Sequence, residues 1–233
     1  SLCVFGSKDG WVYCLQASDG KLVWRYRTVD AERQIVSYDQ LESTWPVSGA
    51  VLVQDGSVYC VAGRSMFLDG GLRYLRLDPA TGEMLSETIM NERDPLLGGS
   101  IQKYDSWLDM TTTLPDVLAS DEHNIYMRSL PFDKEGNRRR ISHFPAASAP
   151  ARLFSPTGFL EDSWFHRTYW TYARCFPGGW NGHLAAGRYN PSGRLLVTDG
   201  STIYGYGRKP SYYRWTTSLE YRLFATDKKN EPR

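Results

Sequence analysis

The side chains best suited to chemistry gather in three segments of the chain. Residues 28–46 and 64–71 carry acids, an indole and a guanidinium, and a third segment near 161–170 carries a similar mixture. Such a mixture suits a sugar or another polar ligand, because the ring stacks on the ligand while the charged groups bind its hydroxyls. The predicted ligand-binding residues are Glu42, Trp45, Arg64, Asp69, Asp162, Trp164, His166 and Arg167.

The same residues have a second interpretation. Charged and aromatic groups in long loops often hold those loops together through hydrogen bonds and ion pairs, and this structural interpretation is the favoured one. Catalysis would also need an acid and a base within hydrogen-bond reach of one point. The sequence predicts no catalytic residue. Convergence of Glu42, Arg64, Asp69, Asp162 and His166 on one pocket would distinguish an enzyme from a binding module.

Other signatures of chemistry are missing from the sequence. The four cysteines form no C-x-x-C pair, and there is no H-E-x-x-H, G-x-S-x-G or P-loop motif, so no metal site is predicted. The 27 basic and 26 acidic side chains give a formal charge of +1, which argues against a nucleic-acid partner. The apolar runs are only a few residues long, so no membrane span is expected.

A repeated turn organises the elements that must position these groups. An Asp-Gly pair followed by alternating residues ending in Tyr occurs at 9–13, 55–59 and 199–204, with a weaker copy at 121–126. Asp-Gly favours two-residue hairpin turns because both central residues need a positive φ. If residues 7–10 form the first hairpin loop, Cys3 faces Cys14 across two strands. A disulfide is then one possibility, and two small buried thiols are the favoured one.

A second repeat sets the length of the structural unit. A strand, a turn with glycine and another strand recur at 15–24 and 77–86, with a weaker copy at 132–137. Gly20 and Gly82 are 62 residues apart, and Gly136 follows Gly82 after 54 residues. A propeller blade takes roughly 40–50 residues, so each step is one blade with an insertion. Aromatic residues at 14%, 21 Gly and 12 Pro are typical of many short strands. One short helix at 30–43 and a turn at 115–120 are the only other elements expected.

The predicted fold is all-β: a β-propeller of four-stranded antiparallel blades, present here as an incomplete fragment of about four blades. The blades are expected near 2–27, 47–90, 115–140 and 150–224, with long insertions. Because the chain opens inside a strand and closes on a polar segment, the sequence is interpreted as a piece of a longer protein.

These repeats resemble a known family. The segments 15–24 and 77–83 are similar to the pyrroloquinoline-quinone-like β-propeller repeat, V-Y-A-L-D-A-x-T-G-x-x-x-W. The segments 38–47, 62–71 and 162–170 look like those of mostly uncharacterised bacterial proteins carrying this repeat. The resemblance implies further blades beyond the fragment, in a ring of about eight. It also implies that Trp24 packs between neighbouring blades, and that other side chains fill the next joint, where Ser86 takes its place.

The resemblance bears on cofactor and function. Quinone-dependent members of the family use a calcium ion, an aspartate base and often a pair of adjacent cysteines, and this sequence has neither the cysteine pair nor a cluster of calcium-type ligands. No cofactor is therefore expected. The resemblance implies a non-catalytic binding or scaffold module of a bacterial envelope or secreted protein, with a protein or carbohydrate ligand. The alternatives are part of a quinone-dependent dehydrogenase, a carbohydrate-active enzyme with its site at the channel mouth, or blades that only support a fused catalytic domain.

Overall fold

The computed structural model describes residues 1–48, 51–94, 98–100, 115, 117–127, 130–139, 151–154, 170–173, 190–208 and 221–228. Within these residues every regular element is a β-strand and every strand pairing is antiparallel. The chain divides into two compact units, residues 1–104 with 113–140 and residues 105–112 with 141–233.

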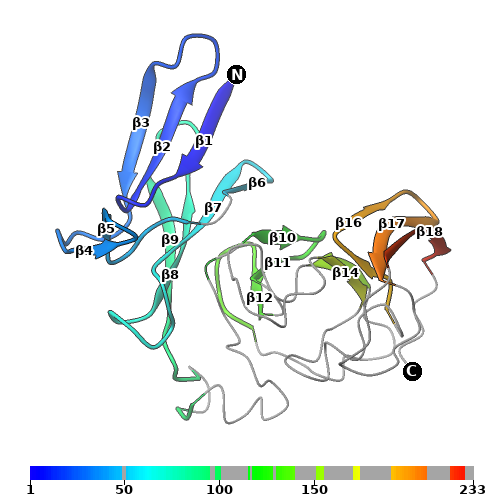
Figure 1. Ribbon diagram of the computed structural model, residues 1–233. Helices are drawn as coiled ribbons and strands as arrows, with labels where there is room; N and C mark the ends of the chain where they lie inside the picture. The colour runs from blue at the N-terminus through cyan, green and yellow to red at the C-terminus, as the bar shows by residue number, and fades with distance from the viewer. Residues whose placement is uncertain are drawn as a thin grey trace. The chain divides into compact units, whose positions relative to one another are not determined.

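The first unit contains three sheets and one separate hairpin (Figure 1). The first sheet has the strands β1 (Leu2–Gly6), β2 (Trp11–Gln16) and β3 (Leu22–Arg27). The separate hairpin has β4 (Gln34–Ser37) and β5 (Gln40–Ser43). The second sheet has β6 (Leu52–Gln54), β7 (Ser57–Ala62), β8 (Leu72–Leu77) and β9 (Met84–Met90). The third sheet has β10 (Leu118–Ser120), β11 (Asn124–Met127) and β12 (Leu130–Asp133).

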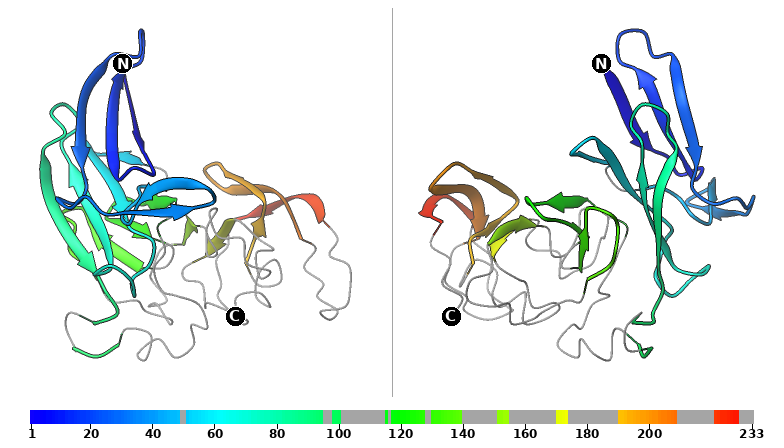
Figure 2. Two further views of the ribbon diagram at one scale, coloured as in Figure 1. Left: turned by 60° about the vertical axis from the view of Figure 1, so that its left-hand side comes forward. Right: turned by 180° about the vertical axis from the view of Figure 1, so that it is seen from behind.

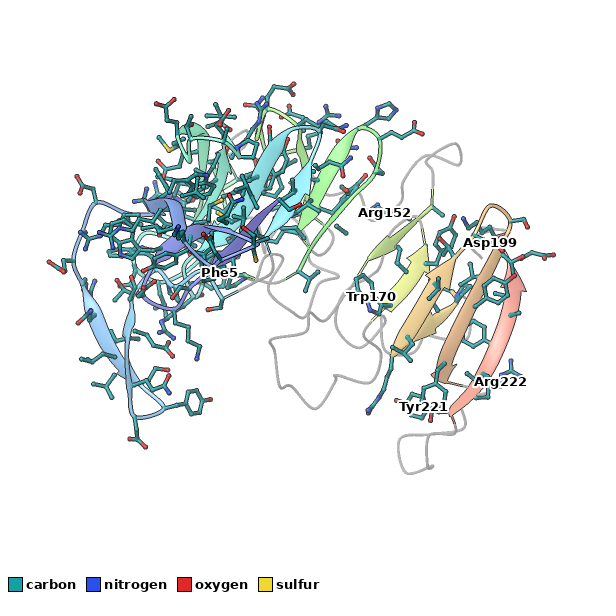
Figure 3. All side chains as sticks on the ribbon, turned by 90° about the horizontal axis from the view of Figure 1, so that it is seen from above. Phe5, Arg152, Trp170, Asp199, Tyr221 and Arg222 are labelled. Atoms are coloured by element: carbon teal, nitrogen blue, oxygen red, sulfur yellow. The ribbon has the colours of Figure 1, made fainter. Side chains whose placement is uncertain are left out.

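The second unit contains two sheets. One has β13 (Arg152–Phe154), β14 (Trp170–Ala173) and β15 (Ser192–Gly193), and the other has β16 (Leu195–Thr198), β17 (Thr202–Arg208) and β18 (Tyr221–Asp227). Figure 3 shows Asp199 near the β16–β17 turn and Tyr221 and Arg222 where β18 begins. The stretch 150–224, which the sequence predicts to be one blade, therefore holds strands of two sheets.

The strand order confirms the predicted fold class: the chain is all-β, built of small antiparallel up-and-down sheets as in an incomplete β-propeller. Among the described residues one sheet has four strands and the others have three, apart from the β4–β5 hairpin. The number of blades and their closure into a ring stay predictions.

The helix predicted at 30–43 is wrong, because residues 34–43 form the β4–β5 hairpin. Ile35 pairs with Glu42 and Val36 with Leu41, so alternate side chains share a face as in any antiparallel pair. The turn consists of Tyr38 and the residue after it, which have φ of 50° and 61°. Positive φ at both central residues defines the turn type whose twist matches that of the two strands. The turn expected at 115–120 is in part strand β10.

The first two sheets share one design. The β2–β3 turn is closed by Gln16 N–H to the Lys21 carbonyl at 2.8 Å and Gly20 N–H to the Gln16 carbonyl at 2.9 Å. The β8–β9 turn has the same two bonds 62 residues later, both at 2.9 Å, from Asp78 to Glu83 and from Gly82 to Asp78. Both strand pairs also have a register shift at equivalent positions, after residue 14 and after residue 76. The repeat deduced from the sequence is therefore a structural repeat.

The joint between these two sheets is made by Trp24. Its side chain is 7% exposed, and its Nε1–H donates to the Pro79 carbonyl at 2.9 Å. A Cβ added to Gly82 would lie 2.6 Å from the indole ring, so only glycine leaves room for it. The buried residues of this joint belong to one hydrophobic cluster that includes Cys14, Cys60 and Leu75. Trp24 thus packs between neighbouring sheets, as the resemblance implies.

The joint between the second and third sheets is filled by other side chains. Ser86 stands where the first sheet has Trp24, and its Oγ would lie 2.8 Å from a Cβ added to Gly136 in the third sheet. The missing indole is replaced by stacked rings, with Tyr74 at 4.2 Å from Phe132 and 6.1 Å from Tyr59 between centroids. Tyr59 Oη–H also donates to a backbone carbonyl of the third sheet, that of residue 134, at 2.9 Å.

The first hairpin corrects the prediction for Cys3 and Cys14. Cys3 pairs with Leu15, and Cys14 pairs with Val4. The loop is one residue longer than a two-residue turn. Gly10 N–H bonds to the Ser7 carbonyl at 3.2 Å, and Gly10, which has a positive φ, is the additional residue. A shift of one residue moves a side chain to the other face of the sheet, so Cys3 is exposed and Cys14 is buried, and both are free thiols.

Candidate functional site

Glu42 is the centre of the predicted site in the described part of the chain. It lies on β5 and is 3% exposed. Lys8, in the β1–β2 loop, donates from Nζ to Oε1 at 2.9 Å, and Arg64, in the β7–β8 loop, donates from Nη2 to Oε2. The hydrogen bond from Lys8 is the main cause that holds the pKa of Glu42 below its ordinary value, against the opposing effect of burial. The carboxylate is therefore ionised and joins three segments.

Trp45 and Asp69 form a second tie between the two insertions. The indole Nε1–H of Trp45 donates to the Asp69 backbone carbonyl at 3.0 Å, and the indole is 8% exposed. The Asp69 carboxylate accepts from Arg33 Nη1 at 2.8 Å. Asp69 itself has a φ of 52°, a backbone conformation that acidic and amide side chains tolerate better than most. The loop at 64–71 is thus fixed to the segment 28–46 at two points.

Four of the eight predicted residues are therefore brought together in one region, and they contact each other and their neighbours. Glu42 with Arg64, and Trp45 with Asp69, hold the two insertions against the β1–β2 loop, which matches the structural interpretation of these residues. Their direct contact with a ligand stays a prediction. The other four predicted residues, Asp162, Trp164, His166 and Arg167, lie outside the described residues.

A small polar cleft adjoins this region. It lies between the β1–β2 loop and the segment after β3, and its lining includes Asp9, Trp11, Arg27, Glu32 and Ser43. The guanidinium groups of Arg25 and Arg27 lie 4.7 and 5.7 Å from the centre of the Trp11 ring, which places cations against an aromatic face. The cleft therefore offers hydrogen-bonding groups and an indole already held by two arginines.

The outer face of the β4–β5 hairpin exposes an apolar cross-strand pair. Val36 is 72% exposed and Leu41 is 70% exposed, and their pairing places both on the face opposite Glu42. Tyr38 at the tip is 94% exposed and has a positive φ, which is unusual for a bulky side chain. The hairpin projects from the end of the first sheet that carries the β1–β2 loop (Figures 1 and 2). The hairpin therefore exposes two aliphatic side chains and one aromatic side chain.

Sequence reasoning missed several residues of this region. Lys8 and Arg33 complete the two ion pairs, and nothing in their local sequence signals a partner 34 or 36 residues away. Trp11 and Arg27 could have been paired from the sequence, because a correct register of the first two hairpins makes them cross-strand neighbours.

Within the described ranges, no three histidine, cysteine, aspartate or glutamate side chains lie close enough together to hold a metal ion. A search of the same residues for a long apolar helix that could cross a membrane finds none.

Comparisons with known proteins give structural neighbours only. No family model matches the sequence, and no curated protein matches it. Forty-two solved chains are similar in structure. One of them is BamB from Moraxella catarrhalis, with 14% sequence identity and a TM-score of 0.42 over 89% of this chain. The match spans 55% of the BamB chain.

Proposed function

We propose that this chain is a non-catalytic binding module, built on propeller-type blades, of a bacterial envelope or secreted protein. The observation that carries the proposal is the β4–β5 hairpin, which exposes Val36, Tyr38 and Leu41 above a partly buried ionic cluster of Glu42 with Lys8 and Arg64. The bacterial and envelope setting follows from the repeat resemblance of the sequence.

The β4–β5 hairpin depends on contacts with the neighbouring loops to keep its outer face in place. A two-stranded hairpin alone is marginally stable in water. Here Ser43 N–H bonds to the Lys8 carbonyl at 2.9 Å, and Glu42 binds Lys8 and Arg64. In this proposal the predicted site residues serve recognition by holding the hairpin in place.

The chemistry of the outer face favours a protein partner over a carbohydrate. Val36 and Leu41 form an apolar cross-strand pair without polar groups for sugar hydroxyls. The two-stranded sheet also has two edges without a paired strand among the described residues, and such edges accept an extended segment of a partner. The partner we propose is therefore a protein segment with apolar side chains.

Photo-crosslinking from the hairpin tip tests this proposal. With a benzophenone amino acid in place of Tyr38, we expect a discrete protein adduct in envelope extracts. The adduct should disappear when Val36 and Leu41 are both changed to serine. The matched control is Val53→Ser, since Val53 is 58% exposed on another strand, and this change should leave the adduct intact. An adduct that survives the double change would contradict the proposal.

Two further measurements address the alternatives. Calorimetric titration of the chain with pyrroloquinoline quinone and calcium should show no binding, and tight calcium-dependent binding would redirect the search to alcohol or sugar oxidation. A glycan array should show no specific binding. Specific glycan binding that Val36→Ser with Leu41→Ser leaves unchanged would instead assign the ligand to the polar cleft.

A further inference from the structure

The two outer edges of the β4–β5 hairpin can be identified from its hydrogen bonds. Thr44 N–H donates to the Arg33 carbonyl at 3.0 Å, so these two residues form a hydrogen-bonded pair at the base of the hairpin. Hydrogen-bonded and non-hydrogen-bonded pairs alternate along an antiparallel ladder. The backbone groups that point away from the hairpin are therefore those of Gln34 and Val36 on β4 and of Leu41 and Ser43 on β5.

The outer edge of β5 is occupied at its base. Ser43 N–H donates to the Lys8 carbonyl at 2.9 Å, and the Ser43 carbonyl accepts from Arg64 Nη2 at 3.4 Å. These bonds attach β5 to the β1–β2 loop and to the β7–β8 loop. A partner strand along β5 would have to displace them.

The outer edge of β4 is open. In the part of the chain that the structure describes, the outward N–H and C=O groups of Gln34 and Val36 have no hydrogen-bond partner. Gln34 is exposed, and Val36 is 72% exposed. The edge therefore offers two donors and two acceptors at alternate residues, which is the pattern that an extended segment of another chain pairs with.

The β4 edge begins at the polar cleft. Gln34, the first residue of β4, lines the cleft together with Trp11 and Arg27. The Arg27 guanidinium lies 5.7 Å from the centre of the Trp11 ring, and its ion pair with the exposed side chain of Glu32 is long, at 4.0 Å. Among the described residues it makes no hydrogen bond. A guanidinium with free donors is suited to bind a carboxylate with two parallel hydrogen bonds.

Two other charged groups of the cleft already have hydrogen-bond partners. The Asp9 carboxylate accepts from the backbone N–H of Trp11 at 3.1 Å, and Arg33 donates to Asp69 at 2.8 Å. Arg27 is therefore the cation of the cleft whose donors are free for a ligand.

We propose that the β4 edge binds an extended segment of a partner protein as a third, antiparallel strand, and that an acidic side chain of this segment binds Arg27. This inference rests on the proposed function, because it names the edge of the hairpin and the kind of segment that the partner supplies. Antiparallel pairing is the more stable arrangement per residue. An apolar side chain opposite Val36 extends the row of Val36 and Leu41. Because β4 starts at the cleft, the acidic residue lies on the C-terminal side of that apolar residue.

The probe is a synthetic eight-residue peptide, with six residues of alternating threonine and valine followed by two aspartates, titrated into the ¹⁵N-labelled full chain. We expect the amide signals of Gln34 and Val36 to shift, and their hydrogen exchange to slow, at millimolar peptide, with smaller changes at Leu41. The control peptide has every valine N-methylated, which removes the N–H groups directed at β4. It should bind at least about tenfold more weakly.

Two proline variants distinguish the edges. Val36→Pro removes an outward N–H of β4, and Leu41→Pro removes one of β5, while both leave the hydrogen bonds between the two strands in place. Each variant also removes one side chain of the exposed apolar pair, so the loss of apolar contact is matched. We expect Val36→Pro to weaken peptide binding at least about tenfold more than Leu41→Pro does. The amide signals of Glu42 and Ser43 report whether the hairpin is intact in both variants.

A matched pair of arginine variants tests the cleft. Arg27→Gln should weaken binding of the aspartate peptide about threefold, which is the size expected of a solvent-screened ion pair. It should leave the binding of a peptide with asparagines in place of the aspartates unchanged. Arg25→Gln is the control, because Arg25 lies 4.7 Å from the centre of the same Trp11 ring but does not line the cleft. It should leave the binding of both peptides unchanged.

Three results would overturn the proposal. They are absence of peptide binding at millimolar concentration, equal losses in the two proline variants, and an effect of Arg27→Gln no larger than that of Arg25→Gln. The proposed function has its own test in the crosslink from position 38. A crosslink lost in the double serine variant, together with equal losses in the two proline variants, would leave that function standing and overturn the added strand.

Discussion

Replacing Gly82 by alanine tests the joint between the first two sheets, and Gly20→Ala is its internal control. Both residues have nearly the same positive φ in equivalent turns. An L-residue in this conformation costs about 1 kcal/mol in the free energy of unfolding. Gly20→Ala should show that cost alone, because no described atom lies within 4 Å of the added Cβ.

Gly82→Ala should cost more, because the added Cβ would lie 2.6 Å from the Trp24 ring. Forced overpacking costs about 1–3 kcal/mol. Displacement of the indole would also weaken its bond to the Pro79 carbonyl, with a net value of about 1 kcal/mol. We therefore expect Gly82→Ala to lower the free energy of unfolding by roughly 2–3 kcal/mol more than Gly20→Ala does.

Urea unfolding followed by far-ultraviolet circular dichroism measures this difference. In a Trp24→Ala background the penalty of Gly82→Ala should fall to that of Gly20→Ala, since the clash is gone, giving a coupling free energy of roughly 2–3 kcal/mol. Equal destabilisation by the two alanine variants in the native background, within about 0.5 kcal/mol, would refute the proposed packing.

Three other predictions concern the insertions and the thiols. Glu42→Gln should lower the free energy of unfolding by about 2 kcal/mol at neutral pH, as a partly buried ionic cluster loses its anion. The pKa of Glu42 is lower in the folded chain than in the unfolded chain. Its contribution to the free energy of unfolding is therefore complete above the unfolded pKa of about 4.3 and is lost as the pH falls through the folded pKa. Unfolding measured at a series of pH values should show this loss in the native chain and not in the glutamine variant. Tyr38→Asn together with Asp39→Gly should raise the free energy of unfolding by about 1 kcal/mol, measured by urea unfolding, because both new residues accept a positive φ. Cys3 should react with a maleimide in the native chain, whereas Cys60 should react only after unfolding, since burial raises the pKa of its thiol to about 12. Mass spectrometry of the labelled peptides distinguishes the two cysteines, and fast labelling of Cys60 in the native chain would contradict the structure.

The parts of the fold that the sequence predicts are those set by local turn chemistry. Gly20 and Gly82 are spaced as the repeat requires, and their turns have identical hydrogen bonds. The two Asp-Gly turns at 9–10 and 55–56 differ, however: the second has two residues of positive φ, whereas the first is a longer loop. Identical dipeptides therefore produced different registers, because Asp9 also accepts from the backbone N–H of Trp11 and from the hydroxyl of Tyr13.

The site was less predictable than the fold. The sequence assigned Glu42, Arg64 and Asp69 to two insertions without pairing them. Lys8, which binds Glu42, and Arg33, which binds Asp69, are 34 and 36 residues away from these partners, so their approach depends on the packing of whole sheets. The helix expected at 30–43 failed for a related reason: the polar residues there suit either structure, and the buried carboxylate of Glu42 favours the hairpin that brings it to Lys8.

The joint at Trp24 has a consequence for divergence among repeats. The indole is recognised by a main-chain carbonyl and by the absence of a side chain at Gly82, so its hydrogen bond uses no side chain of the receiving turn. The second joint shows how far this freedom extends, because there even the tryptophan is replaced, by Ser86 and stacked rings. An ancestral repeat of this kind can lose nearly all sequence likeness among its copies while their geometry persists.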